Sequence, residues 1–267
     1  MRTRRKEQPG RSRSPEEWIY GLNPVLEALR AGREISSIYL SVARREKILE
    51  LEQALGKRGL QARRVDDSFF EERFPKGHQG IAARVEPRSY ADLDELLLAP
   101  GKKGQTPLFL ILDGIEDPRN FGSVLRVADA GGVHGIVIQS HRSASLTPEA
   151  VKASSGASEH VQISMVPNIK HAMRVMQESG ITIIGADAEG KETVWEADLT
   201  DPVALVVGSE GAGMRRTVKE HCDLIVCLPM LGHVNSLNAS VASGIIVFEI
   251  MRQRMQKNKI IKDKGAL

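Results

Sequence analysis

Six short apolar runs in the second half of the chain constrain its fold more than any other feature. They read LFLILDG, GIVIQ, VQISMV, ITIIGAD, VALVVGSE and DLIVCLP. Apart from VQISMV, they do not alternate apolar with polar residues, as a strand with one face in water does. Such runs are typical of parallel strands that are covered on both faces. Helix-like segments separate most of them, so the sequence predicts an α/β domain with a mostly parallel sheet over residues 108–267.

The first part of the chain alternates β and α patterns on a smaller scale. The stretch WIYGLNPVLEALRAGREISSIYLS predicts a strand, a helix and a second strand, and more such segments follow up to residue 87. We therefore expect a small α/β domain over residues 18–98. The glycine, lysine and proline residues of APGKKGQTP predict a linker over residues 99–107. Residues 1–17 are expected to form a disordered basic tail.

Charge is spread unevenly over the 267 residues. The net charge is +3, yet the first 13 residues contain six arginine or lysine residues and one acid. A basic tail on a near-neutral body favours weak, salt-sensitive attraction to a polyanion. A solvated tail without any partner is an equally good interpretation of the charge alone.

Composition excludes several other classes of protein. No apolar stretch reaches the roughly 18 residues that a membrane span requires, so we expect no membrane partner. The basic start is not followed by the apolar region of a secretory signal. The two cysteines, Cys222 and Cys227, are too few for a disulfide framework and lack the neighbours of a metal site. The sequence therefore predicts reduced thiols, no metal and a cytoplasmic protein.

Three stretches rich in glycine and small polar residues each follow a predicted strand. They are LDGIEDPRNFGSVLRVADAGG (112–132), VVGSEGAG (206–213) and LPMLGHVNSLNASVASGIIVFEI (228–250). Ligands of open α/β sheets bind beyond the carboxyl ends of the strands, so we expect the three to converge on one site. The glycine spacing of the second stretch fits neither a P-loop nor a dinucleotide fingerprint. It leaves either a tight turn or a loop whose backbone approaches a ligand closely.

Two charged residues of these stretches, Arg126 and Glu210, stand among small or apolar neighbours. Arg126 lies in the small, apolar segment GSVLRVADA, where it needs a carboxylate such as Glu210 or a phosphate as its partner. The first alternative is a structural ion pair and the second is a functional contact. Asn120 is a plausible helix cap. The sequence contains no Ser-His-Asp, Cys-His or metal constellation, so the chemistry is expected to depend on orientation in a dry pocket.

The last predicted helix is apolar on nearly every side. One face contains Leu237, Val241, Ile245 and Phe248, and other sides carry Ile246, Val247, Ile250 and Met251. A helix of this kind is buried on several faces, and one sheet covers only one of them. We expect a second subunit to cover another face, with Ile246 and Ile250 pointing outward toward it. Asn235 or Ser236 is predicted to cap the start of this helix.

As a set, DPRNFGSVLRVADAGG, LVVGSEGAGM and LPMLGHVNSLNASVASGIIVFE closely resemble the three motifs of the SpoU (TrmH) family of RNA ribose 2′-O-methyltransferases, which belongs to the SPOUT class. YGLNPVLEALR and HQGIAARV resemble the RNA-binding domain of the subgroup that modifies a guanosine in the peptidyl-transferase P loop of 23S ribosomal RNA. The resemblance implies S-adenosylmethionine as methyl donor, a C-terminal trefoil knot, 23S ribosomal RNA as partner, and a homodimer with shared active sites.

The resemblance also assigns roles to individual residues. It implies catalytic roles for Asn120, Arg126, Glu210, Ser236 and Asn238, and cofactor contacts at Gly208, Leu228, Leu237 and Ser240. The family's arginine has been proposed as the base that takes the 2′-hydroxyl proton. Because an arginine side chain stays protonated at neutral pH, we expect it instead to bind the target phosphate and stabilise the developing alkoxide.

Three other functions remain open at this point. The same chemistry on transfer RNA is the first, because the N-terminal domain favours ribosomal RNA only by analogy. A non-catalytic RNA-binding protein on the same scaffold is the second, and the presence of all the motif residues counts against it. A nucleotide-dependent oxidoreductase is the third, and the glycine spacing disfavours it.

Overall fold

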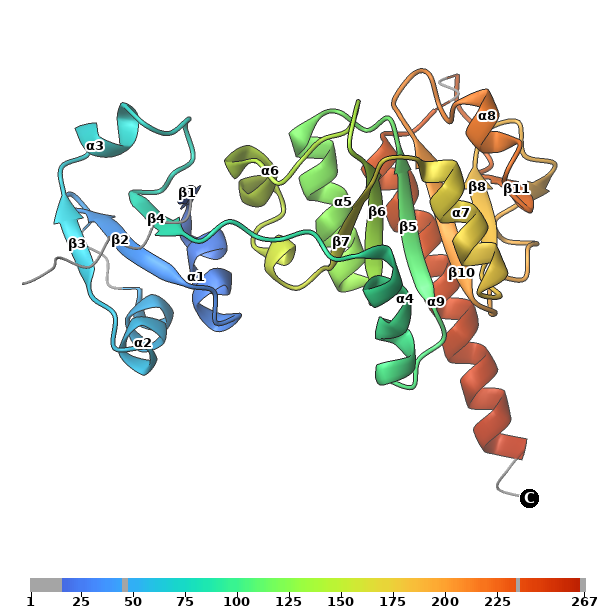
Figure 1. The fold of residues 1–267 in the computed structure, drawn as a ribbon, viewed down its shortest axis with the longest axis horizontal. Coiled ribbons are helices and arrows are strands. Elements are labelled where there is room, and N and C mark those ends of the chain that lie inside the picture. The colour runs from blue at the N-terminus through green and yellow to red at the C-terminus, as the bar shows by residue number, and fades with distance from the viewer. Residues whose placement is uncertain (1–15, 45–47, 234–235, 265–267) are drawn as a thin grey trace, which may run out of the picture.

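A computed structural model describes residues 16–44, 48–233 and 236–264 and contains two sheets (Figure 1). The N-terminal sheet has four strands in the order β1-β4-β2-β3, in which β4 runs antiparallel to β1 and β2 while β2 and β3 are parallel. Its elements are β1 (Glu17–Tyr20), α1 (Leu22–Arg30), β2 (Ile35–Ser41), α2 (Leu49–Lys57), β3 (Ala62–Val65), α3 (Ser68–Glu71) and β4 (Ile81–Val85).

The C-terminal sheet has seven strands, all parallel, in the order β7-β6-β5-β10-β8-β11-β9. The two sheets together confirm the predicted fold class. The strands are β5 (Leu108–Asp113), β6 (Gly135–Gln139), β7 (Ile163–Val166), β8 (Thr182–Ala186), β9 (Glu192–Thr193), β10 (Val203–Gly208) and β11 (Leu224–Cys227). The helices are α4 (Leu93–Lys102), α5 (Pro118–Ala130), α6 (Pro148–Ala153), the 3-10 helix η1 (Ala157–Glu159), α7 (Ile169–Glu178), α8 (Arg216–Lys219) and α9 (Ala239–Lys264).

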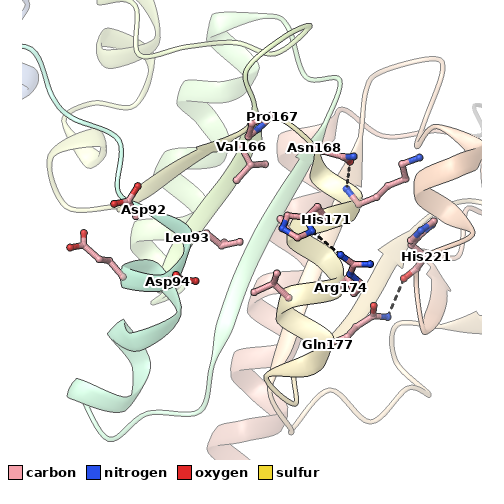
Figure 2. Close-up of a pocket in the computed structure, with 14 residues that line it drawn as sticks. Asp92, Leu93, Asp94, Val166, Pro167, Asn168, His171, Arg174, Gln177 and His221 are labelled. Carbon is pink, nitrogen blue, oxygen red and sulfur yellow. Dashed lines mark hydrogen bonds between the residues drawn. The ribbon is translucent and has the colours of Figure 1, made fainter.

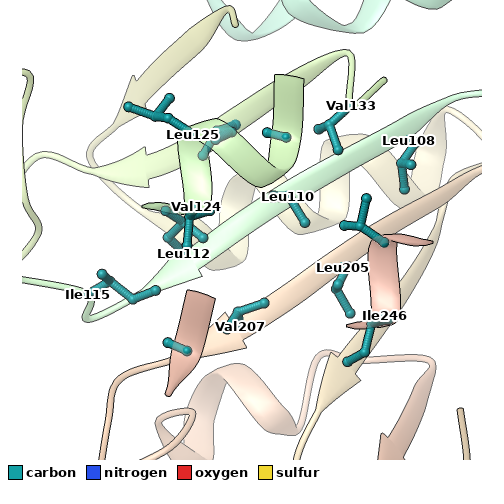
Figure 3. Close-up of a cluster of buried hydrophobic side chains, with 14 of the residues drawn as sticks. Leu108, Leu110, Leu112, Ile115, Val124, Leu125, Val133, Leu205, Val207 and Ile246 are labelled. Carbon is teal, nitrogen blue, oxygen red and sulfur yellow. The ribbon is translucent and has the colours of Figure 1, made fainter. Parts of the chain in front are cut away.

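Both faces of the seven-stranded sheet are covered, which explains the unalternating apolar runs. Leu108, Leu110 and Leu112 of β5 pack against α5 and α9 (Figure 3). The intervening Phe109 and Ile111 join the cluster on the other face, together with buried side chains of α4 and α7. Every residue of β5 and β10 is buried. A strand in this position gains from apolar residues at successive positions rather than at alternate ones.

Helix α4 occupies part of the segment that the sequence predicts to be a linker. Residues 99–102 are helical, and the extended connection lies earlier, at residues 86–92. Leu96 and Pro100 of α4 are both buried, and Leu96 packs in the same cluster as Phe109. This packing outweighs the helix-breaking composition of the segment. The domain boundaries at 18–98 and 108–267 stay predictions.

Helix α9 buries a different face from the one that its periodicity suggests. Ile246 and Ile250 are 1% and 0% exposed and pack in the core, so their predicted outward position is wrong. Val241 and Phe248 of the other face are 49% and 43% exposed. The sequence shows that several faces are apolar but not which of them the sheet covers.

The N-terminal domain rests on α6 and η1. Val151 of α6 joins the core of the four-stranded sheet. Arg33, which follows α1, forms an ion pair of 2.7 Å with Glu159 of η1, and both side chains are nearly inaccessible to solvent.

Of the predicted basic tail, residues 1–15 lie outside the described residues, and strand β1 begins at Glu17. The trefoil knot stays a prediction.

Candidate active site

A cavity of about 580 Å³ lies at the carboxyl ends of three neighbouring strands of the large sheet. Ala186 of β8, Gly208 of β10 and Leu228, just after β11, form one part of its wall. The rest of the wall comes from residues 209–214 and from the start of α9. Two of the three stretches that sequence analysis singles out therefore meet here, as expected for parallel strands.

The loop after β10 is closed by hydrogen bonds that only a glycine-rich sequence permits. Ser209 and Gly213 exchange backbone hydrogen bonds of 3.1 and 2.9 Å. Gly211 and Gly213 have φ values of +81° and +65°, a region that L side chains rarely adopt. A Cβ atom on Gly208 would lie 2.2 Å from the backbone of Gly213 and Met214. The loop is a tight turn, and its backbone lines the cavity.

Asn238 holds the start of α9 in place. Its Oδ1 accepts hydrogen bonds from the backbone N–H of Ser240 at 2.9 Å and from the Ser240 hydroxyl at 2.5 Å. This is the geometry of a helix N-cap. The predicted cap at Ser236 is therefore wrong because Ser236 lies before the first turn, and Asn235 lies outside the described residues.

The amide nitrogen of Asn238 connects all three motifs. It donates one hydrogen bond to Asn120 Oδ1 at 2.9 Å and another to Glu210 Oε1. Asn120 lies in the first turn of α5, whose N-cap is Asp117 rather than Asn120. Residues far apart in the sequence thus form one hydrogen-bonded cluster beside the cavity.

Arg126 stands apart from this cluster. Its side chain is exposed on α5, and it forms no hydrogen bond or ion pair within the described part of the chain. Glu210 bonds to Asn238 instead. The interpretation of Arg126 and Glu210 as a structural ion pair is therefore wrong. The guanidinium is free to bind a group from outside the subunit.

The cavity brings together only some of the candidate residues. Its lining includes Gly208, Glu210, Leu228, Ser236 and Leu237. Asn120 and Asn238 reach it through Glu210. Ser240 does not line it, because the Ser240 hydroxyl turns back to the Asn238 side chain.

One charged group in the cavity wall escapes sequence analysis. Lys219 of α8 lies 2.8 Å from Asp187 Oδ2 and 2.9 Å from Glu189 Oε2, and all three residues line the cavity. The hydrogen bonds that the Lys219 ammonium donates to the Asp187 and Glu189 carboxylates raise its pKa. The available signal was the position of Asp187, directly after the carboxyl end of β8.

A second missed residue is Asp113 at the end of β5. Its side chain is inaccessible to solvent and accepts hydrogen bonds from the backbone N–H and Nε of Arg215, each at 2.7 Å. Arg215 directly follows Met214, which lines the cavity. The pair ties the glycine loop to the central strand. Its sequence signal was an acid that ends a fully apolar run.

A larger cavity, of about 950 Å³, lies elsewhere, between α4 and α7 (Figure 2). Asp92, Asp94 and Glu95 line its α4 side, and Lys170, His171 and Arg174 line its α7 side. None of the candidate residues belongs to it. The smaller cavity, where the motifs meet, is therefore the candidate active site.

The residues around the smaller cavity fit a cofactor better than a metal. The described residues contain no group of three or more histidine, cysteine or acidic side chains that could hold a metal ion, and no helix among them is long and apolar enough to cross a membrane. Backbone groups of the glycine loop, apolar Leu228 and Leu237, and the Ser236 hydroxyl suit the adenosyl part of S-adenosylmethionine. Asp187 and Lys219 offer charged partners for its polar groups.

Both halves of the chain match known protein families. Residues 107–248 match the SpoU rRNA Methylase family, and residues 18–91 match the RNA 2′-O ribose methyltransferase substrate binding family. The chain is 41% identical to the 23S rRNA (guanosine-2′-O-)-methyltransferase RlmB of Escherichia coli, over 89% of this chain and 99% of that protein. It is 40% identical to the putative TrmH family tRNA/rRNA methyltransferase YacO of Bacillus subtilis, over 89% and 96% of the two chains.

Solved structures of SpoU methyltransferases have a similar fold. The SpoU methyltransferase AviRb of Streptomyces viridochromogenes, in complex with the cofactor AdoMet, superimposes with a TM-score of 0.75 at 26% identity and covers 90% of this chain and 91% of its own. The motifs, the parallel sheet and the cavity at its carboxyl edge agree with these matches. The chain therefore belongs to the SpoU (TrmH) family of S-adenosylmethionine-dependent RNA 2′-O-methyltransferases.

Proposed function

We propose that this enzyme methylates the ribose 2′-hydroxyl of a guanosine in the peptidyl-transferase P loop of 23S ribosomal RNA. The observation that carries the proposal is the similarity to the Escherichia coli 23S rRNA enzyme, which extends over both domains at 41% identity. It includes the part of the chain that matches the substrate-binding family. Bacterial relatives with ribosomal RNA as substrate also support a cytoplasmic location.

The cluster around Asn238 is suited to orient the reacting ribose. When bound, S-adenosylmethionine supplies a methyl group that is already activated, so the protein gains most by holding the 2′-oxygen in line with it. Glu210 reaches into the cavity and is itself oriented by Asn238. Ser236 adds a hydroxyl at the cavity wall. In this proposal Glu210, Asn120 and Ser236 position the ribose, while Gly208, Leu228 and Leu237 hold the cofactor.

In this proposal Arg126 binds the negatively charged groups of the reaction. Its guanidinium is exposed and forms no ion pair among the described residues. A planar guanidinium binds a phosphate through two parallel hydrogen bonds and stabilises the charge that develops on the 2′-oxygen. We therefore assign Arg126 to the target phosphate and not to proton removal.

A homodimer completes the site in this proposal. Val241, Phe248 and Met255 of α9, spaced by seven residues, and Leu237, just before the helix, form a stripe of apolar side chains that are each at least 37% exposed. Such a stripe suits a symmetric contact with the same stripe of a second subunit. Leu237 belongs both to the stripe and to the cavity wall, so a partner on the stripe lies beside the cavity. We propose that this partner supplies its Arg126.

Transfer RNA is the second candidate substrate. The Bacillus subtilis relative, at 40% identity, has a name that covers both tRNA and rRNA. Purified enzyme with tritiated S-adenosylmethionine distinguishes the two. The proposal expects label in a 23S fragment that contains the P loop and none in a tRNA pool. Label in tRNA alone would contradict it.

A further inference from the structure

The face of the N-terminal sheet that points away from α1 and α2 combines aromatic rings with arginines. Residues paired across neighbouring strands point to the same face, so the strand register defines two rows. One row contains Trp18, Arg84 and Ser37, and the next contains Tyr20, Ala82, Tyr39 and Arg63. The opposite face packs against α1 and α2 and contains Ile19 and Ile38.

This face is only partly covered. Phe69, Phe70 and Phe74, which lie in or near α3, pack against Tyr20 and Tyr39. Phe70 is fully buried, as a core residue should be. Trp18 and Tyr39, whose rings are 5.5 Å apart, keep part of their surface open to solvent. These two rings therefore offer apolar surface to a ligand from outside the domain.

Two exposed arginines flank the open rings. The Arg84 guanidinium lies 4.8 Å from the centre of the Trp18 ring. Arg63 is exposed beside Tyr39 and forms no hydrogen bond or ion pair with any residue that the structure describes. Aromatic rings bind unpaired bases by stacking, and neighbouring arginines bind the phosphates between them. A double helix hides its base faces and offers nothing to stack.

We propose that Trp18, Tyr39, Arg63 and Arg84 form a platform that binds an unpaired stretch of the RNA substrate. The proposal rests on the RNA methyltransferase function and adds a second binding site, outside the methylation cavity. It assigns the N-terminal domain the recognition of single-stranded nucleotides near the target.

Tryptophan fluorescence reports on this platform directly. The chain has two tryptophans, so the full-length variant Trp195→Phe leaves Trp18 as the only one. A decamer of uridine should quench Trp18 emission in a saturable way, because stacked bases quench indole. A fully paired RNA duplex of similar length should quench it far less. Binding of the decamer without a change in Trp18 emission, or equal quenching by the duplex, would overturn the platform.

Substitutions give a second test. Arg63→Ala removes an exposed side chain and should weaken binding of the uridine decamer by roughly 10- to 100-fold, because hydrogen bonds between charged groups are lost. The matched control is Lys57→Ala, which removes one exposed positive charge from α2, a helix on the covered side of the sheet. Trp18→Phe, which keeps the packing, should give a smaller loss. Equal effects of Arg63→Ala and Lys57→Ala would show that only overall charge matters.

The outcome also separates this inference from the proposed function. Arg63→Ala should raise KM for RNA and leave both kcat and calorimetric binding of S-adenosylmethionine unchanged. Normal RNA affinity in Arg63→Ala and Trp18→Phe, with methylation at the proposed guanosine, would overturn only the platform. Absence of methylation there by the wild-type enzyme would overturn the proposed target, while Trp18 quenching would still be measurable.

Discussion

At the scale of single residues, Asn238 performs several tasks with one amide group. Its oxygen caps α9, and its nitrogen binds Asn120 and Glu210. An aspartate could cap the helix equally well but has no N–H to donate. Substitutions of Asn238 can therefore separate the capping of α9 from the hydrogen bonds to Asn120 and Glu210.

Two substitutions of Asn238 should give different results. Asn238→Ala should lower the free energy of unfolding by about 1 kcal/mol because the helix loses its cap. Asn238→Asp should keep the cap but place a second carboxylate against Glu210, so its methyltransferase activity should fall as far as that of Asn238→Ala. Thermal unfolding and a tritium-transfer assay measure the two effects. An active Asn238→Asp enzyme would contradict the role of the amide nitrogen.

Asp113 should control cofactor binding through the glycine loop. Asp113→Asn keeps the shape of the side chain but removes the charge that faces Arg215. We expect a loss of about 2 kcal/mol in stability, since hydrogen bonds to charged groups are involved, and weaker binding of S-adenosylmethionine by calorimetry. Asp201→Asn, which disturbs the exposed pair with Lys257, is the matched control. Equal cofactor affinity in both variants would show that Asp113 does not support the loop.

Residue-level predictions from sequence succeed where chemistry restricts the choice. Glu210 was the only acid among small residues, and it does line the cavity. The cap was misplaced because Ser236 and Asn238 are both good N-cap residues, and only the backbone shows where α9 begins. Asp113 and Lys219 were missed because their importance comes from partners about 100 and 30 residues away in the chain.

At the scale of elements, periodicity predicts strands better than the orientation of a helix. The six apolar runs became β5, β6, β7, β8, β10 and β11 because strands buried on both faces require no alternation. Helix α9 has apolar residues on several sides, so its periodicity cannot separate the face that packs on the sheet from the face that remains open. Its C-terminal part also projects beyond the sheet in Figure 1.

The open face of α9 gives a direct test of dimerisation. Val241→Asp combined with Phe248→Asp should yield a folded monomer, because both side chains are exposed in the single subunit. Asn258→Asp, which adds a negative charge on the same helix, is the control and should stay dimeric. Analytical ultracentrifugation measures the mass, and circular dichroism checks the fold. A dimer that survives both substitutions would contradict the proposed interface.

At the scale of the whole molecule, the exposed Arg126 makes no contact with the hydrogen-bonded cluster of Asn120, Glu210 and Asn238, so we infer that one subunit holds only part of the reaction machinery. If each site combines Arg126 of one subunit with Asn238 of the other, two inactive variants should complement each other. A 1:1 mixture of Arg126→Ala and Asn238→Asp chains, refolded together, should recover about one quarter of wild-type activity, since half the dimers contain one intact site. An inactive mixture in which heterodimers have been demonstrated would place both residues in the same subunit's site.

The most direct test of the account is a map of ribose 2′-O-methylation in 23S ribosomal RNA. The RNA is taken from the source organism without this gene and from the same strain with the wild-type or Arg126→Ala gene restored. We expect one 2′-O-methylation signal, at a guanosine in the P loop, to disappear with the gene, to return with the wild-type gene, and to stay absent with Arg126→Ala. An unchanged P-loop signal in the strain without the gene, or its full return with Arg126→Ala, would contradict the account.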